Sequence, residues 1–266
     1  MARVLILSSL VASGHVGLSA AGPACQALGH EVTGLPTTIL SNHPGFASVA
    51  GRPVPPEDLA AMIDALDANG FLADHAAVLT GYLPTAAHVA LAASLIDRMR
   101  AGAPGLRVVV DPVLGDAPGG LYLPEAVAEA VRDGLVRRAD VLTPNAFELG
   151  WLTGGTVAGL PGARTAAEAL PCPRVLVTSA PVAAARETGV LDVGGGRARL
   201  YRGPRREGVP HGPGDVLAGL IAAGLSVPVA LGHLQGLIDA SLGAPHRRVH
   251  HAAWRAAPAC APTGEE

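Results

Sequence analysis

A Gly-x-Gly-Asp turn at residues 212–215 opens an apolar run with the character of a helix. Backbone N–H groups of a glycine-rich turn at a helix start form a site for an anion, and Asp215 lies at its edge. A carboxylate there is suited to take the proton of a hydroxyl group that attacks phosphorus. The simpler interpretation is that Asp215 only caps the helix. Short glycine motifs occur by chance, so the rest of the sequence must decide.

Two more carboxylates, Asp111 and Glu148, follow apolar runs that are typical of buried strands. Carboxylate oxygens bind Mg²⁺ directly or through water. A base, an anion hole and metal-binding carboxylates are the parts that phosphoryl transfer requires. Taken singly, Asp111-Pro112 and the segment Thr143-Pro144-Asn145 are ordinary turn sequences. Their repeated position after strands is what favours a functional interpretation.

All 19 basic residues of the Lys and Arg type are arginines, so the chain contains no lysine. A Walker A loop requires its lysine, so the sequence excludes a P-loop NTPase. It also excludes an enzyme that holds pyridoxal phosphate as a Schiff base, since no lysine amine is present. A phosphate site in this chain must use arginine, backbone N–H groups, helix amino termini or a metal ion.

The composition is that of a compact globular protein, with 49% hydrophobic and 15% charged residues in 266. A net charge of −3 and short, scattered arginine pairs of the solvated-surface type predict no nucleic-acid binding. Three cysteines without metal-site spacing are typical of free thiols in a reducing cytoplasm. The short apolar run at 4–9 favours a buried strand over a signal peptide, and residues 216–232 are too broken by glycine and proline for a membrane span.

Strand-like and helix-like segments alternate through most of the chain, which predicts an α/β fold with a mainly parallel central sheet. A glycine-rich hairpin is expected at 189–203. Ligands of open α/β sheets bind at the carboxyl ends of the strands, where the polar motifs fall. We expect one domain at 1–245 and a frayed tail at 246–266, where His, Arg, Ala and Pro dominate.

In their order along the chain, these motifs resemble the ribokinase-like superfamily and, within it, the pyridoxal (vitamin B6) kinases. The resemblance is carried by SGHVGLSAA (13–21), LSNHPG (40–45), LTGYLP (79–84), DPVLGD (111–116), TPNAFELGWLTG (143–154), VLVTSAP (175–181) and GPGDVLAGL (212–220). It implies a three-layer α/β/α fold and ATP-dependent phosphorylation of the 5′-hydroxymethyl group of pyridoxal, with pyridoxine and pyridoxamine as further candidate acceptors. It also implies Mg²⁺ and a homodimer.

The resemblance assigns roles to individual residues. Asp215 matches the catalytic base, and Gly212 and Gly214 match the anion hole. Residues that match the vitamin pocket are Ser9, His43, Pro44, Gly45, Tyr82 and Asp215. Residues that match the nucleotide site are Asp111, Thr143, Asn145, Glu148, Thr178 and Gly212, with Asp111 and Glu148 also serving the metal. The segment 115–124 matches a flap that closes over ATP and excludes water.

The chain departs from the family pattern at several positions. Ser13 stands where the family often has Tyr, Pro44 replaces a common Thr, and Pro213 replaces a Thr or small residue. The stretch after Thr178 is short, which predicts a trimmed adenine pocket. Two alternatives therefore stay open: a kinase for another hydroxymethyl heterocycle, such as the thiamin-precursor pyrimidine, and a vitamin- or nucleotide-binding relative with weakened catalysis. The three intact carboxylates favour an active kinase.

Overall fold

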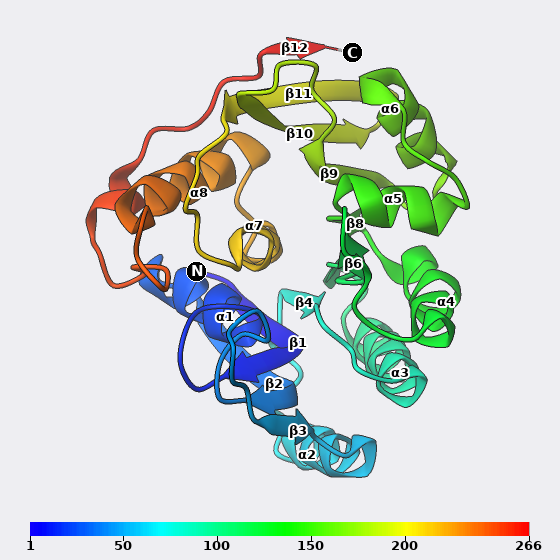
Figure 1. The fold of residues 1–266 in the computed structure, drawn as a ribbon. Coiled ribbons are helices and arrows are strands. Elements are labelled where there is room, and N and C mark those ends of the chain that lie inside the picture. Colours follow the sequence, from blue (N-terminus) through cyan, green and yellow to red (C-terminus); the bar gives the residue numbers. More distant parts are fainter. Residues whose placement is uncertain (266) are drawn as a thin grey trace.

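The computed structural model describes residues 1–265, and within them a central sheet has the strand order β12-β11-β10-β9-β8-β5-β4-β1-β2-β3 (Figure 1). Its strands are β1 (Arg3–Val11), β2 (Glu31–Leu40), β3 (Gly51–Pro53), β4 (Ala77–Thr80), β5 (Arg107–Val110), β8 (Val141–Leu142), β9 (Arg174–Ala180), β10 (Glu187–Gly194), β11 (Arg197–Pro204) and β12 (Gly264–Glu265). A separate two-stranded sheet joins β6 (Gly115–Asp116) to β7 (Gly120–Leu121).

The sheet is parallel through its centre and antiparallel at both edges. Strand β1 pairs in parallel with β2 and β4, and the parallel pairing continues through β5, β8 and β9. Strands β9 to β12 pair antiparallel, as do β2 and β3. The expected hairpin is β10–β11, where Gly195 and Gly196 both have positive φ, which glycine adopts without strain. The predicted α/β class with a mainly parallel sheet is confirmed.

Helices cover both faces of the sheet (Figure 1). One face carries α1 (Leu18–Ala27), α7 (Pro213–Ala222) and α8 (Val227–Ser241). The other carries α2 (Pro56–Ala68), α3 (Ala86–Gly102), α4 (Glu125–Gly134), α5 (Ala146–Thr153) and α6 (Gly159–Ala169).

The first strand shows why both faces are covered. Successive side chains of a strand point to opposite faces. Val4 and Ile6 belong to the core under α1, α7 and α8, whereas Leu5 and Leu7 belong to the core under the other helices. A strand that is apolar at every position must be buried on both sides. The three-layer α/β/α arrangement follows from that pattern.

The segment after residue 245 differs from the frayed tail expected from its composition. Arg247 and Trp254 are each 1% exposed, and Val249 is buried as well. The indole N–H of Trp254 donates to the carbonyl of Val249 at 2.9 Å. The segment packs closely on Gly236 of α8, where an added β-carbon would lie 2.9 Å from the β-carbon of Ala257 and 3.2 Å from the α-carbon of Trp254. A few large side chains thus anchor a segment whose average composition is typical of a loose tail.

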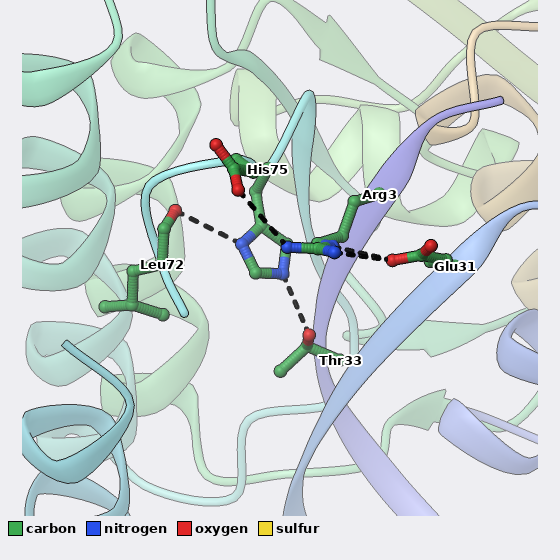
Figure 2. Close-up of polar contacts among 6 residues, drawn as sticks. Arg3, Glu31, Thr33, Leu72 and His75 are labelled. Atoms are coloured by element: carbon green, nitrogen blue, oxygen red, sulfur yellow. Dashed lines mark hydrogen bonds and ion pairs between the residues drawn. The ribbon is translucent and has the colours of Figure 1, made fainter. Parts of the chain in front are cut away.

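A polar cluster connects the amino ends of β1 and β2 to the loop before β4 (Figure 2). His75 is 4% exposed, and its ring nitrogens contact the Thr33 hydroxyl at 2.9 Å and the Leu72 carbonyl at 3.2 Å. Arg3 pairs with Glu31 at 2.8 Å beside it. The burial of His75 lowers its pKa. The described helices include none that is both long and apolar enough to span a bilayer.

Candidate active site

Asp215 is the third residue of α7, whose amino end points to the carboxyl edge of the parallel strands. Gly212 precedes the helix with φ of 96°, and a β-carbon there would lie 2.2 Å from the His15 carbonyl oxygen. Only glycine fits such a backbone approach. Pro213 occupies the first helical position, where a missing N–H breaks no hydrogen bond within the helix. The glycine-rich turn therefore leads directly into the helix.

Burial raises the pKa of Asp215 to about 6, while backbone hydrogen bonding from Gly17 and the positive charge of Arg247 act in the opposite direction. Gly17 begins α1 with φ of 54°, and a β-carbon there would lie 2.4 Å from the Ser9 hydroxyl. A small cavity is lined by both Asp215 and Asp111. The structure thus places two carboxylates from distant parts of the sequence in one cavity.

Asp111 directly follows β5 and is 8% exposed. One of its carboxylate oxygens accepts a hydrogen bond of 3.1 Å from the Thr143 hydroxyl. The pKa of Asp111 is raised, first by burial and then by the negative charges of Glu148 and Asp215. Two further carboxylates thus raise the proton affinity of Asp111, and an acidic group held in such surroundings favours a nearby cation.

Glu148 and Asn145 form a capping box at the start of α5. The Asn145 side chain accepts the backbone N–H of Glu148 at 2.9 Å, and the Glu148 carboxylate accepts that of Asn145 at 2.8 Å. The other Glu148 oxygen accepts the Leu114 N–H at 2.8 Å. Burial raises the pKa of Glu148 to about 7, although these backbone hydrogen bonds oppose the shift. Both residues therefore shape the start of α5, and the negative charge of Glu148 reaches Asp111.

The predicted flap is the β6–β7 hairpin, and the Asn145 amide donates to the Gly115 carbonyl at its base at 2.8 Å. Asp116 of the hairpin lines a cavity of about 450 Å³ together with Asn145 and Ser179. A second cavity, of about 260 Å³, is lined by Thr178, Gly214 and residues of α8. The two cavities share the wall residues Ser179, Thr188 and Arg205, so they form one groove that leads to the amino end of α7.

Among the residues that the resemblance assigns to the vitamin pocket, His43 stacks on His211 with 3.8 Å between ring centroids. The ring nitrogen Nδ1 of His43 accepts the Gly45 N–H at 3.0 Å, while Pro44 and Gly45 themselves are exposed. Tyr82 is half-buried against the core, and burial raises its pKa. Asp111 is thus in contact with Thr143 and within reach of the charges of Glu148 and Asp215, whereas these loop residues make their contacts elsewhere.

Sequence reasoning missed several residues of this region. Arg205 belongs to one of the short arginine pairs interpreted as solvated surface; it is indeed exposed, and it also lines both cavities of the groove. His15, His211 and His246 line a small cavity of about 10 Å³ together with His43. His211 immediately precedes the glycine turn, which is a signal that could have been used. Nothing in the local sequence around His246 marks it, because its position depends on how the chain returns after α8.

The central sheet lies between two layers of helices, and an acidic cavity and a glycine turn lie at the carboxyl ends of its parallel strands. This is the arrangement of the ribokinase-like fold. The sequence model of the phosphomethylpyrimidine kinase family matches residues 17–232. A pyridoxine/pyridoxal/pyridoxamine kinase of Bordetella avium is 37% identical over 233 residues, covering 86% of this chain and 79% of that protein. A pyridoxal kinase of Leifsonia xyli is 34% identical over 229 residues, covering 83% and 80%. The chain belongs to the pyridoxal kinase family.

Solved structures agree with this assignment. The pyridoxal kinase of Leishmania donovani in complex with ADP and pyridoxamine superimposes with a TM-score of 0.89 at 30% identity, covering 99% of this chain and 100% of that chain. The pyridoxal kinase of Entamoeba histolytica gives a TM-score of 0.89 at 26% identity and covers 99% of both chains. The predicted ribokinase-like fold is confirmed.

Proposed function

We propose that this chain is an ATP-dependent kinase that phosphorylates the 5′-hydroxymethyl group of pyridoxal and also accepts pyridoxine and pyridoxamine. The observation that carries the proposal is the shared cavity of Asp215 and Asp111 at the amino end of α7. Relatives named for activity on these three vitamers, and related structures with ADP and pyridoxamine or pyridoxine, support the choice of substrates.

Asp215 acts as the base in this proposal. It takes the proton of the vitamer's hydroxyl group as that oxygen forms a bond to the γ-phosphorus, and the bond between phosphorus and the ADP oxygen breaks. A pKa of about 6 leaves Asp215 ionised at neutral pH and still able to hold a proton. The backbone N–H groups at the start of α7 stabilise the charge on the phosphoryl oxygens, although Pro213 contributes none.

The donor set fits Mg²⁺ bound together with nucleotide. Asp111 and Glu148 would hold the ion, which neutralises phosphate charge when bound. Both carboxylates are buried and have raised pKa values, so a cation relieves an existing repulsion. Residues 1–265 contain no cluster of three or more His, Cys, Asp or Glu able to hold a metal alone. Magnesium commonly uses one or two carboxylates plus substrate phosphates, which matches this set.

The groove formed by the two joined cavities is the proposed nucleotide site, with Thr178 and Asn145 on its walls. The β6–β7 hairpin at its mouth would close over the phosphates and exclude water, which otherwise competes for the phosphoryl group. We also propose that the enzyme works in the cytoplasm, in keeping with its free cysteines, and as a homodimer. Exposed Ile39, Phe46 and Val49 beside the edge strand β3 support an association surface.

Initial rates with ATP and a panel of acceptors test the proposal. The panel contains pyridoxal, pyridoxine, pyridoxamine and hydroxymethylpyrimidine. We expect the highest kcat/KM for a B6 vitamer, by about tenfold or more over the pyrimidine, because the pocket contacts differ between the two rings. A preference for the pyrimidine would support the other kinase activity. Binding of ATP and pyridoxal without a phosphorylated product would support a relative with weakened catalysis.

A further inference from the structure

Arg247 is an arginine buried beside the catalytic centre that the sequence motifs do not include. It lies in the segment after α8 and is 1% exposed. Its Nε donates to the His211 carbonyl at 3.0 Å, and its Nη2 donates to the Pro210 carbonyl. Both acceptors belong to the loop that leads into Gly212. Arg247 thereby connects the end of the chain to the start of the anion hole.

The third guanidinium nitrogen of Arg247 is unsatisfied. Nη1 is fully buried and has no hydrogen-bond partner among the described residues. The Nδ1 atom of His15, on the loop before α1, is buried without a partner as well. Buried polar groups are nearly always hydrogen-bonded, so each exception requires an explanation. Here two exceptions come from the two loops that approach the amino end of α7.

The charges around Arg247 indicate what its free nitrogen would bind. Burial lowers the pKa of Arg247 and the negative charge of Asp215 opposes that shift, although no hydrogen bond joins the two side chains. The positive charge of Arg247 also helps to lower the pKa of His15. Asp215 in turn raises the pKa of Asp111, which directly follows β5. A buried cation without a bonded carboxylate is strongly unfavourable unless an anion compensates it. In a chain without lysine, Arg247 is a buried cation whose charge acts on Asp215, whereas Arg205 and Arg206 are exposed at the rim of the groove.

We propose that Arg247 binds the transferred phosphoryl group, its Nη1 N–H donating to a phosphoryl oxygen while Nε and Nη2 keep the 210–212 loop in place. The inference rests on the proposed kinase function, since that reaction brings the anion to Asp215. Arg247 stays protonated throughout and transfers no atom. In this proposal the loops at 12–17 and 205–212, which contain no helix or strand, move to open Nη1 to the anion. A guanidinium–phosphate contact is charge-assisted and stronger than a neutral hydrogen bond.

The test compares ligands with and without the phosphate group. Dissociation constants for pyridoxal 5′-phosphate and pyridoxal are measured on the full-length chain, for wild type, Arg247→Met, Arg247→Lys and Arg248→Met. Arg248 is the adjacent, exposed arginine and serves as the matched control. We expect Arg247→Met to weaken binding of the phosphate ester about tenfold or more and binding of pyridoxal less than threefold. Arg247→Lys should recover part of the loss, and Arg248→Met should match wild type.

A purely structural role predicts a different pattern, because a displaced 210–212 loop would weaken both ligands equally. That result, or wild-type affinity of Arg247→Met for the phosphate ester, would overturn the inference. If Arg247→Met does not fold, the inference is tested on Arg247→Lys. This variant is expected to bind pyridoxal 5′-phosphate more weakly than wild type and to bind pyridoxal with unchanged affinity. Wild-type turnover of pyridoxal is measured in parallel. Turnover without a selective effect at Arg247 rejects this inference alone, whereas no turnover and no binding in wild type rejects the kinase function as well.

Discussion

Replacement of Asp215 by Asn removes the proposed base and keeps the shape of the side chain. General-base catalysis typically accelerates a reaction about 10²- to 10⁴-fold, so kcat of the variant should be lower than that of wild type by about that factor. ATP binding and the unfolding temperature should stay close to wild type. Because the pKa of Asp215 is raised to about 6, wild-type kcat should fall as the pH drops through that value. Retention of more than about a tenth of wild-type kcat would remove Asp215 from the base role.

Replacement of Glu148 by Gln tests the cation site. The chain has no lysine to neutralise phosphate charge, so much of that task falls to the divalent ion. The Mg²⁺ concentration for half-maximal rate should rise. The amide oxygen of the Gln side chain can keep the capping-box hydrogen bond from the Asn145 N–H, whereas its NH₂ group cannot accept the Leu114 N–H, so the unfolding temperature is measured alongside. Titration of rate against Mg²⁺ measures the effect. Full activity of the wild type in excess EDTA would show that no divalent ion is required.

The separate residues of the site differ in how far the sequence could predict them. Asp111, Glu148 and Asp215 were found because each follows a strand or opens a helix within a recognisable motif. That Asp111 and Asp215 share a cavity depends on sheet pairing, which the local sequence does not encode. The pair Arg247-Arg248 was interpreted as solvated surface, which is wrong for Arg247, since that side chain is 1% exposed. Its segment has the composition of a loose tail, and its partners are backbone carbonyls of a distant loop.

At the scale of elements, the start of α7 decides whether Pro213 harms the anion hole. Proline has no backbone N–H, but the N–H of the first helical position makes no hydrogen bond within the helix, so none is lost. Gly214 and Asp215 retain their backbone N–H groups. We expect Pro213→Thr to change kcat less than about fivefold and to lower the unfolding temperature slightly, because proline restricts the unfolded chain. Steady-state kinetics and thermal unfolding measure both. A gain of a hundredfold or more in kcat would show that Pro213 damages the site.

The elements that sequence patterns predicted best are the buried parallel strands and the glycine hairpin β10–β11. Strand β1 is apolar at successive positions and could be recognised from that alone. The short elements β3, β8 and β12 have two or three residues and carry no periodicity, so their assignment requires the neighbouring strand. Helix α6 contains Pro161 and Gly162, which local propensity assigns to a loop; packing against β9 and β10 overrides that preference.

The stability of the whole molecule should depend on the protonation of buried His75. Its pKa is lowered in the folded state, so the unfolded chain binds a proton more readily. The free energy of unfolding should therefore decrease as the pH falls below about 6.5 and level off below the folded pKa. Urea unfolding across this range should give a smaller pH dependence for His75→Gln than for wild type. His251→Gln, at an exposed position, is the matched control; equal slopes for all three proteins would contradict this account.

The central claim is that the chain transfers a phosphoryl group from ATP to one hydroxyl group of a B6 vitamer. Phosphorus NMR of the reaction with pyridoxal, and with an analogue that lacks the 5′-hydroxyl, tests this most directly. The account predicts one phosphate ester on the 5′-carbon with an equal amount of ADP, and no ester with the analogue. ATP hydrolysis to free phosphate in both reactions, or an ester formed with the analogue, would contradict it.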